Sequence, residues 1–307
     1  MDLSVVIPLF NEHDSLNELC RQVHNQCSNL NLEFEICFVD DGSTDNSLAI
    51  LKNLKTTYPE IKIISFRKNY GKSAALSEGF KLASGNIIIT MDADLQDDPS
   101  EIPHLMNKIG EGFDMVSGWK KKRKDPIGKK LPSKLFNFTV ARLTGIKIHD
   151  FNCGLKAYKK DVIKEIPVYG ELHRFLPVLA HWRGYVVGEI VVRHHARKYG
   201  ITKFGFERFL NGFFDLLTVL FITRYRQKPL HLFGSLGLLL IFCGFIILLY
   251  MTMIWFQGLG IGNRPLFFLG ILLMIVGLQS FSIGLIGEMI TNSGDSDHLY
   301  GIKEKIL

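Results

Sequence analysis

Two long apolar runs in the last third of the chain constrain its fold more than any other feature. Residues 230–263 contain no Asp, Glu, Lys or Arg, and Leu232–Phe256 is apolar nearly throughout. Pro265–Gly287 is a second run without charge. Each run exceeds the ~20 residues that an α-helix needs to cross a bilayer. The sequence therefore predicts a hairpin of two transmembrane helices, about 232–256 and 265–287, within residues 229–290.

The charges beside these runs predict how the hairpin is oriented. Arg224, Arg226 and Lys228 precede the first run, whereas the connecting turn contains only Arg264. Because Lys and Arg accumulate on the cytoplasmic side of membranes, we expect both termini and the preceding domain to be cytoplasmic. The predicted location is the inner (cytoplasmic) membrane, multi-pass, with residues 291–307 as a cytoplasmic tail.

The segment before the hairpin is predicted to be an amphipathic helix. Between Phe204 and Arg224, polar residues recur at a spacing of three to four, and the other face is nearly all Phe, Leu, Val and Ile. So broad an apolar face favours a helix that lies in the membrane interface, over residues 204–228. An ordinary helix that faces a protein core is the alternative.

The rest of the chain has the pattern of an α/β domain. Short apolar strands alternate with helical segments, which predicts βαβ units and a mostly parallel sheet. The loops after successive strands then gather at one edge of the sheet, where open α/β sheets bind ligands. These loops are Pro8–Glu12, Asp40–Asp45, Arg67–Lys72 and Asp92–Gln96. Further along the chain, we expect a helix over Glu171–Arg183 and a strand over Tyr185–His195.

Two acids follow the apolar run that begins at Ile87. Asp92 and Asp94 flank one residue, so both carboxylates can approach one divalent cation. Two carboxylates this close repel each other unless a cation or a proton intervenes. Hard oxygen ligands favour Mg²⁺ or Mn²⁺, which commonly stay bound to substrate phosphates. The pattern indicates an Asp-x-Asp site for a metal and a diphosphate; a solvated turn that carries acids is the alternative.

A second acidic loop, Asp40–Asp45, follows a strand and precedes a helix. A carboxylate there can accept hydrogen bonds from a base imide or from ribose hydroxyls. Gly42 permits a tight turn, and the N-terminus of the following helix favours anions nearby. By itself the loop could be a plain helix cap, but combined with Asp92 and Asp94 it is a specific signal.

Several basic residues have two interpretations each. Lys72 lies in Asn69–Ser73, which is not a P-loop because its first glycine would fall at Phe66. Lys72 at a helix start either meets a diphosphate or belongs to an ordinary cap. The run Lys120–Lys124 looks like a nuclear or nucleic-acid patch, but it is either a solvated loop or a contact for lipid phosphate and anionic headgroups. His173-Arg174 either faces the pocket or caps a helix.

Adjacent residues on a strand point to opposite faces, so His194-His195 is a poor metal site. With Arg193, Arg197 and Lys203 around them, an anion-binding strand is the better interpretation.

The combined motifs resemble the family 2 glycosyltransferases of the GT-A fold. The matching segments are Val6–Glu12, Val39–Asp45 and Asp92–Gln96. Together with Asp150–Gly154, Gly200–Phe204 and the two apolar runs, they resemble the polyprenyl-phosphate glycosyltransferases. These include dolichol-phosphate mannose synthase and bacterial undecaprenyl-phosphate sugar transferases. Where this family has an aromatic residue and a tyrosine, the chain has Leu155 and Phe204.

The resemblance implies a cytoplasmic GT-A (Rossmann-like) glycosyltransferase domain over residues 1–203. Its reaction would be the inverting transfer of one hexose or N-acetylhexosamine from a nucleotide-sugar, expected to be a UDP-sugar, to a polyprenyl phosphate. Undecaprenyl phosphate is the expected acceptor, and the product would serve cell-envelope glycan or lipopolysaccharide modification. Mg²⁺ or Mn²⁺ is the implied cofactor, a membrane and possibly a homo-oligomer such as a tetramer are the implied partners, and nucleic acid is not implied.

The site residues follow from matching positions and from the interpretations above. For the nucleotide-sugar they are Pro8, Asn11, Glu12, Asp40, Asp41, Lys72 and Asp92. The metal residues are Asp92, Asp94 and Gln96, and the catalytic residues are Asp94 and Asp150. For the lipid phosphate they are Arg123, Lys130, Lys134, Arg197 and Lys203.

The acceptor chemistry limits what Asp150 has to do. A phosphate monoester has a second pKa near ~6 and is mostly dianionic at neutral pH. A general base is then nearly redundant, so the hypothesis is that Asp150 orients the acceptor or sugar, or takes the residual proton, rather than supplying most of the rate.

The sequence disfavours two other functions. A processive polysaccharide synthase is disfavoured by having only two spans and no evident Gln-x-x-Arg-Trp segment. A membrane scaffold with a nucleotide-binding fold is disfavoured by the intact acids Asp40, Asp41, Asp92 and Asp94.

Overall fold

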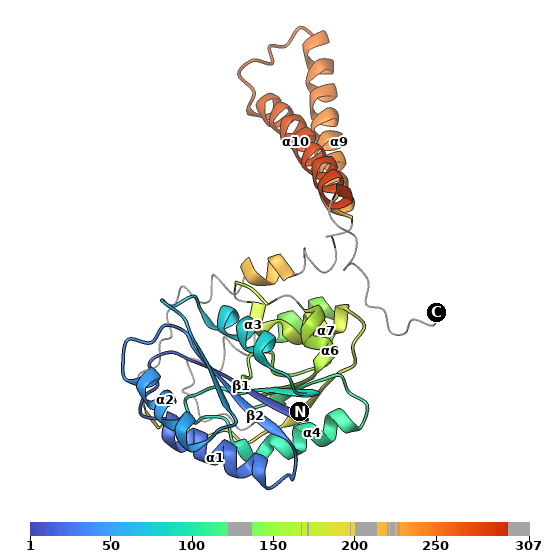
Figure 1. The fold of residues 1–307 in the computed structure, drawn as a ribbon. Helices are drawn as coiled ribbons and strands as arrows, with labels where there is room; N and C mark the ends of the chain where they lie inside the picture. Colours follow the sequence, from blue (N-terminus) through green and yellow to red (C-terminus); the bar gives the residue numbers. More distant parts are fainter. Residues whose placement is uncertain are drawn as a thin grey trace. The chain divides into compact units, whose positions relative to one another are not determined.

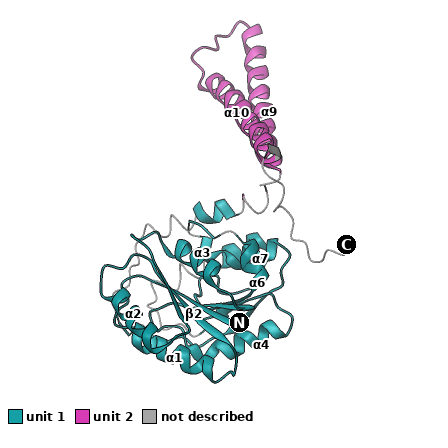
Figure 2. Ribbon diagram, viewed as in Figure 1, with its two compact units in different colours: residues 1–219, 300–307 teal, residues 220–299 magenta. Residues whose placement is uncertain are grey.

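The computed structural model describes two compact units, residues 1–219 and residues 220–299 (Figure 2). Each unit is considered by itself below. The predicted boundaries at residues 203, 228 and 290 stay predictions. The residues that the structure describes are 1–121, 137–166, 168–170, 172–196, 198–199, 214–219, 221, 225 and 228–293, with side chains to 291.

A seven-stranded sheet forms the centre of the first unit (Figure 1). The strands are β1 (Leu3–Leu9), β2 (Phe34–Asp40), β3 (Ile61–Ser65), β4 (Ile87–Thr90), β5 (Met115–Trp119), β6 (Lys156–Lys159) and β7 (Val187–Val191). Their order across the sheet is β3-β2-β1-β4-β6-β5-β7, and only β6 runs against its neighbours. The predicted α/β fold with a mostly parallel sheet is confirmed.

Helices cover both faces of the sheet. Figure 1 shows α1, α2 and α4 on one face and α3, α6 and α7 on the other. The helices are α1 (Leu16–Ser28), α2 (Ser47–Thr57), α3 (Lys72–Leu82), α4 (Ile102–Gly110), α6 (Lys160–Glu165) and α7 (Leu176–Trp182). The arrangement is three layers, as expected for a parallel sheet whose crossover helices protect both faces.

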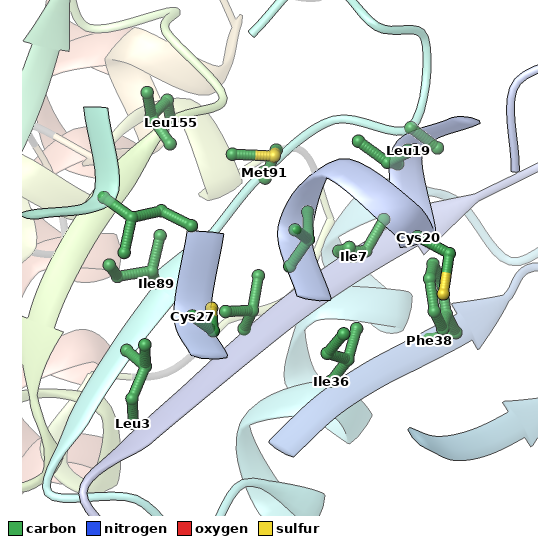
Figure 3. Close-up of a cluster of buried hydrophobic side chains, with 14 of the residues drawn as sticks. Leu3, Ile7, Leu19, Cys20, Cys27, Ile36, Phe38, Ile89, Met91 and Leu155 are labelled. Atoms are coloured by element: carbon green, nitrogen blue, oxygen red, sulfur yellow. The ribbon is translucent and has the colours of Figure 1, made fainter. Parts of the chain in front are cut away.

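The largest apolar core lies between β1 and α1. Leu3 and Ile7 of β1 point to the same face because side chains alternate along a strand. On α1, Leu19, Cys20 and Cys27 recur at helical spacing and meet them (Figure 3). The core fixes β1 and β2 and therefore the loops that follow them.

The opposite face brings α3 unusually close to the sheet. A Cβ placed on Gly79 would lie 2.4 Å from Cγ1 of Val6 and 3.2 Å from Cγ2 of Val39. Only glycine permits this approach at position 79. Because α3 is held against β1 and β2, its first residues, Lys72 and Ser73, are fixed at the carboxyl edge of the sheet.

The antiparallel strand β6 was not predicted. Because β6 runs against β4 and β5, it begins at the same edge at which its neighbours end. Residues just before β6, including Asp150 and Gly154, are thereby delivered to the edge that carries the other loops.

The segment from residue 171 to residue 195 is less regular than predicted. A short 3₁₀ helix, Leu172–Arg174, precedes α7, so the single predicted helix is wrong there. Pro177 lies in the first turn of α7, where its missing N–H costs nothing and its ring disfavours a helix running through. The strand predicted over Tyr185–His195 is confirmed only for β7, Val187–Val191.

The second unit is a pair of long apolar helices, α9 (Pro229–Phe256) and α10 (Pro265–Ser293). Both are long and apolar enough to cross a membrane, and most of their surface is exposed. Glycines bring them together: a Cβ on Gly237 would lie 2.7 Å from the oxygen of Gly277, and one on Gly244 would lie 2.8 Å from the oxygen of Gly270. The two helices suggest membrane association, while the predicted topology stays a prediction.

Of the predicted interfacial helix, residues 214–219 are helical in the structure. Within them, Phe214 and Leu217 are exposed and Leu216 and Val219 are buried. Most of the remaining residues of 204–228 lie outside the described residues.

The buried carboxylate of Glu35 links three segments at the edge of the sheet where the parallel strands begin. Glu35 Oε1 accepts hydrogen bonds from Ser4 Oγ at 2.6 Å and from the backbone N–H of Ser84 at 2.6 Å, and Lys62 pairs with its other oxygen. Burial raises the pKa of Glu35, but Lys62, Ser4 and Ser84 outweigh burial and the pKa is lowered. A lowered folded pKa adds stability that is present above the unfolded value of about 4.5 and is lost as the pH falls through the folded pKa.

We therefore expect Glu35→Gln to destabilise the first unit by roughly 2 kcal/mol at pH 7, the cost of leaving buried polar groups unsatisfied. The difference between wild type and variant should shrink at pH 4. Thermal unfolding at both pH values measures it. An equal difference at pH 7 and pH 4 would contradict the assignment of the stabilisation to the ionised carboxylate.

Candidate functional site

The loops after β1 and β2 are joined by Asn11. Its backbone N–H donates to Ser43 Oγ at 2.9 Å, and its side-chain oxygen accepts from the N–H of Thr44 at 2.8 Å. Asn11 has φ 54°, in the left-handed region that asparagine tolerates better than most residues. Pro8 lies in β1, and the N–H of Glu12 donates to Ser47 Oγ at 3.1 Å. The first two loops are therefore one rigid surface.

Asp40 and Asp41 shape this surface from within. Asp40 accepts from the N–H of Ser43 at 2.9 Å and from Ser65 Oγ at 2.8 Å. The two oxygens of Asp41 accept from the N–H groups of Tyr70 at 2.7 Å and Gly71 at 2.9 Å. Burial nevertheless raises the pKa of Asp41. Both acids are buried and hold loops together, and their predicted contact with a nucleotide stays a prediction.

Asp92 follows β4 and faces α3 and the start of β6. Its Oδ1 pairs with the ammonium of Lys72, at the N-terminus of α3. Gly154 lies directly against the carboxylate, since a Cβ there would be 2.5 Å from Cγ of Asp92. Burial raises the pKa of Asp92, but the positive charges of Lys72 and Lys120 outweigh burial and lower the pKa. Asp92 is therefore ionised.

Asp94 and Gln96 occupy a tight turn. The N–H of Gln96 donates to Asp94 Oδ1 at 3.2 Å, and Leu95 between them has φ 60°. The backbone oxygen of Gln96 accepts from the N–H of His195 at 2.9 Å, and Gln96 Nε2 donates to the oxygen of His195 at 3.4 Å. The turn is thus held against the segment that follows β7.

The donor set at this turn fits a hard cation that arrives with its substrate. Among the residues that the structure describes, no three His, Cys, Asp or Glu side chains converge as a metal cage. Mg²⁺ does not need such a cage, because one or two carboxylates and substrate phosphates suffice to hold it. Asp92 and Asp94 would supply those carboxylates; their role as metal ligands, and that of Gln96, stay predictions.

Asp150 reaches the same edge from the start of β6. Only 2% of its surface is exposed. Its Oδ1 accepts from the N–H of Asn152 at 3.1 Å, and its backbone oxygen accepts from Ser117 Oγ at 3.2 Å. The structure therefore holds Asp150 in a buried position in the segment that leads to Gly154, the residue that lies against Asp92.

Three buried basic groups lie at the site that were not among the predicted site residues. Lys156 of β6 is buried and donates to the oxygen of Cys153, and burial lowers its pKa. His173, left open from the sequence, contacts Ser73 Oγ through Nδ1 at 2.9 Å. Burial, followed by repulsion from Lys72 and Arg174, lowers the pKa of His173 well below its usual value, so the ring is neutral at pH 7. Lys120, the first residue of a run interpreted as either a solvated loop or a lipid contact, is buried against Asp97.

The five residues predicted for the lipid phosphate cannot be placed in this site. They lie outside the described residues: Arg123, Lys130, Lys134, Arg197 and Lys203.

Lys72 is expected to bind the diphosphate, because its ammonium stands at the N-terminus of α3, where anions are favoured. Lys72→Ala should lower kcat/KM for the donor about 10- to 100-fold, the effect of losing one charge-assisted hydrogen bond. Initial rates at varied nucleotide-sugar concentration measure it. Lys81→Ala is the control, since Lys81 is an exposed lysine of the same helix. Equal effects of the two changes would refute the role.

Comparison with known proteins identifies the family to which this chain belongs. The model of "Glycosyl transferase family 2" matches residues 4–167, more than half of the chain. The chain belongs to glycosyl transferase family 2. The resemblance read from three short motifs is therefore confirmed, and the protein is a glycosyltransferase.

Curated relatives match this glycosyltransferase over nearly its whole length. Dodecaprenyl-phosphate galacturonate synthase of Rhizobium johnstonii is 38% identical, over 95% of this chain and 88% of the relative. Undecaprenyl-phosphate 4-deoxy-4-formamido-L-arabinose transferase of Klebsiella pneumoniae is 37% identical, over 94% and 88%.

Solved structures share the fold of the catalytic unit. Glucosyl-3-phosphoglycerate synthase of Mycobacterium tuberculosis aligns with a TM-score of 0.53 at 17% identity, over 72% of this chain and 80% of that one. The same enzyme in complex with Mn²⁺, UDP-glucose and glycerol 3-phosphate aligns with a TM-score of 0.52. At this identity the likeness establishes the GT-A fold alone.

Proposed function

We propose that this glycosyltransferase moves one sugar from a nucleotide-sugar to a polyprenyl phosphate, with inversion at the anomeric carbon. The observation that carries the proposal is the pairing of Asp92 with Lys72 against Gly154, at the edge where the sheet presents its loops. Two relatives named for transfer to polyprenyl phosphates, each aligned over at least 94% of this chain, support the acceptor. The two long apolar helices suit a lipid substrate.

In this proposal the acids at the turn hold the donor. Asp92 and Asp94 would bind Mg²⁺ or Mn²⁺ together with the diphosphate, and Lys72 would bind a phosphate oxygen. The bound cation supplies positive charge that offsets the charge of the leaving diphosphate. Pro8, Asn11, Glu12, Asp40 and Asp41 would border the base and ribose through the rigid surface of the first two loops.

The acceptor phosphate would attack the anomeric carbon from the side of β6. Because it is mostly dianionic at pH 7, the protein has to hold a dianion more than to remove a proton. The lipid-phosphate residues named from the sequence and the cytoplasmic orientation remain part of the proposal. An oligomer, such as a tetramer, remains a prediction.

Asp150 is expected to orient the acceptor or the sugar rather than act as a base. Asp150→Asn should lower kcat about 10- to 100-fold at every pH between 6 and 9, at saturating lipid. A pH profile of the variant measures it. If activity instead returns as the pH rises well above 6, then proton removal is the role of Asp150.

The sugar is left open by the relatives, which are named for galacturonate and for 4-deoxy-4-formamido-L-arabinose. The decisive experiment offers a panel of nucleotide-sugars, including UDP derivatives of these two sugars, to the protein with undecaprenyl phosphate and Mg²⁺ or Mn²⁺. Mass spectrometry of the lipid product identifies the sugar. One sugar per lipid supports the proposal, a polymer would support a processive synthase, and no product with any donor would overturn it.

A further inference from the structure

A buried ion pair lies behind the turn that carries Asp92 and Asp94. Lys120 Nζ lies 2.8 Å from Asp97 Oδ1, and the two side chains are 9% and 0% exposed. Although burial lowers the pKa of Lys120, the attraction of Asp97 outweighs it and the pKa is raised. The ammonium is therefore charged and compensates a carboxylate that has no access to solvent. Such a pair is costly to break on one side alone.

The other oxygen of Asp97 reaches back to the start of the turn. The backbone N–H of Asp92 donates to Asp97 Oδ2 at 3.3 Å. The backbone of Asp97 is meanwhile bridged to His194, after β7. One residue therefore connects the ends of β4, β5 and β7, and its side chain closes the turn from Asp92 to Asp97 into a ring.

The turn needs such a closure because its backbone is strained. Leu95, with φ 60°, is in the left-handed region, which is unfavourable for a residue with a Cβ. A strained conformation persists only where its surroundings hold it. The backbone pairing with His194 and His195 holds the later part of the turn, whereas the contact from Asp97 holds Asp92.

We propose that Asp97 is a positioning residue of the glycosyltransferase, which fixes Asp92 relative to Asp94, and that Lys120 is the counter-ion that keeps Asp97 in place. The inference rests on the proposed role of Asp92 and Asp94 in holding a cation and a diphosphate. It assigns Lys120 to the interior, whereas the sequence left the run that it begins as either a solvated loop or a lipid contact.

The test compares two double variants that both remove the buried charges. Asp97→Asn with Lys120→Gln keeps polar groups that can preserve both contacts, whereas Asp97→Leu with Lys120→Met keeps neither. We expect both to fold, because a buried pair can be replaced when both charges leave together. Lys120→Met alone should lower the unfolding temperature by roughly 10 °C, since it leaves Asp97 buried and unpaired.

Hydrogen exchange at the amide of Asp92 is the readout that requires no ligand. It should stay protected in the polar double variant and exchange at least about tenfold faster in the apolar one. Affinity for Mn²⁺ in the presence of UDP, measured by electron paramagnetic resonance, should fall about tenfold in the apolar variant only, the usual effect of removing an outer partner of a ligand.

A matched control lies at the opposite edge of the sheet. Asp114 also holds an ammonium, Lys159 Nζ, at 2.8 Å, and accepts a backbone N–H, that of Val186, at 2.9 Å. Asp114→Leu with Lys159→Met should leave both readouts at Asp92 unchanged. Exchange at Asp92 that is equally slow in both Asp97 double variants would overturn the inference. If exchange behaves as expected but wild type does not bind Mn²⁺ with UDP, the positioning role holds and the proposed function fails.

Discussion

Asp94→Ala is expected to reduce sugar transfer by roughly 10³-fold or more while the protein remains in the membrane fraction. The change removes one of the two carboxylates that follow β4. The proposed cation site then keeps only the negative charge of Asp92. Positioned charge at a leaving group is worth several kcal/mol in catalysis, and ~4 kcal/mol corresponds to 10³ in rate. The two apolar helices are untouched by the change, so membrane association should not alter.

The measurement is the initial rate of lipid product formation, together with the share of protein in washed membranes. Asp98→Asn is the matched control from the same loop. Asp98 caps the following 3₁₀ helix through Ser100 and contacts His195 Nε2 at 3.1 Å, and it is not one of the proposed cation ligands. It should keep its rate within a few fold. Retention of a tenth of wild-type activity by Asp94→Ala would refute the metal–diphosphate assignment.

Gly154→Ala is expected to have the second largest effect, about 10²-fold on kcat. The added methyl group would occupy a point 2.5 Å from Cγ and 2.5 Å from Oδ2 of Asp92, closer than real contacts allow. Either the carboxylate rotates away from Lys72 or the start of β6 moves. Both displace Asp92 from the cation, and a displacement of about 1 Å can cost ~10²-fold.

Rates and thermal unfolding separate the two causes of such a loss. A variant whose unfolding temperature is unchanged but whose kcat falls has a misplaced carboxylate rather than a damaged fold. Gly110→Ala provides the control, because a Cβ there meets nothing within 4 Å. If Gly154→Ala works at the wild-type rate, Asp92 does not need the position that the structure gives it.

Much of the donor half of the site could be predicted from residue pattern alone. Apolar strands that end in Asp40 and Asp92 are separated by helices, and parallel strands place their ends at one edge. The residue pattern predicts where these acids lie but not which groups they contact. Asp40 and Asp41 direct their oxygens to Ser43, Ser65, Tyr70 and Gly71, and such contacts between loops depend on tertiary packing.

The buried lysines of the site could not be predicted in the same way. Lysines are almost never fully buried, so nothing in the sequence places Lys120 or Lys156 in the interior. The strand β6 could not be recognised from the sequence, because its four residues, Lys-Ala-Tyr-Lys, lack the apolar run of a buried strand. Only the placement of Asp97, Asp92 and Cys153 around these ammonium groups explains why burial is tolerated.

The reversed direction of β6 has a consequence for how such enzymes can diversify. Since β5 ends and β6 begins at the same edge of the sheet, and the two strands are hydrogen-bonded neighbours, residues 120–155 leave the sheet and return to it at one place. The part of this segment between Lys120 and Asp150 can therefore change in length or composition without altering strand register, while Lys120, Asp150 and Gly154 keep their places near its two ends. Selection can in this way retune one substrate while the β1–β4 half, which would grip the other substrate, stays as it is.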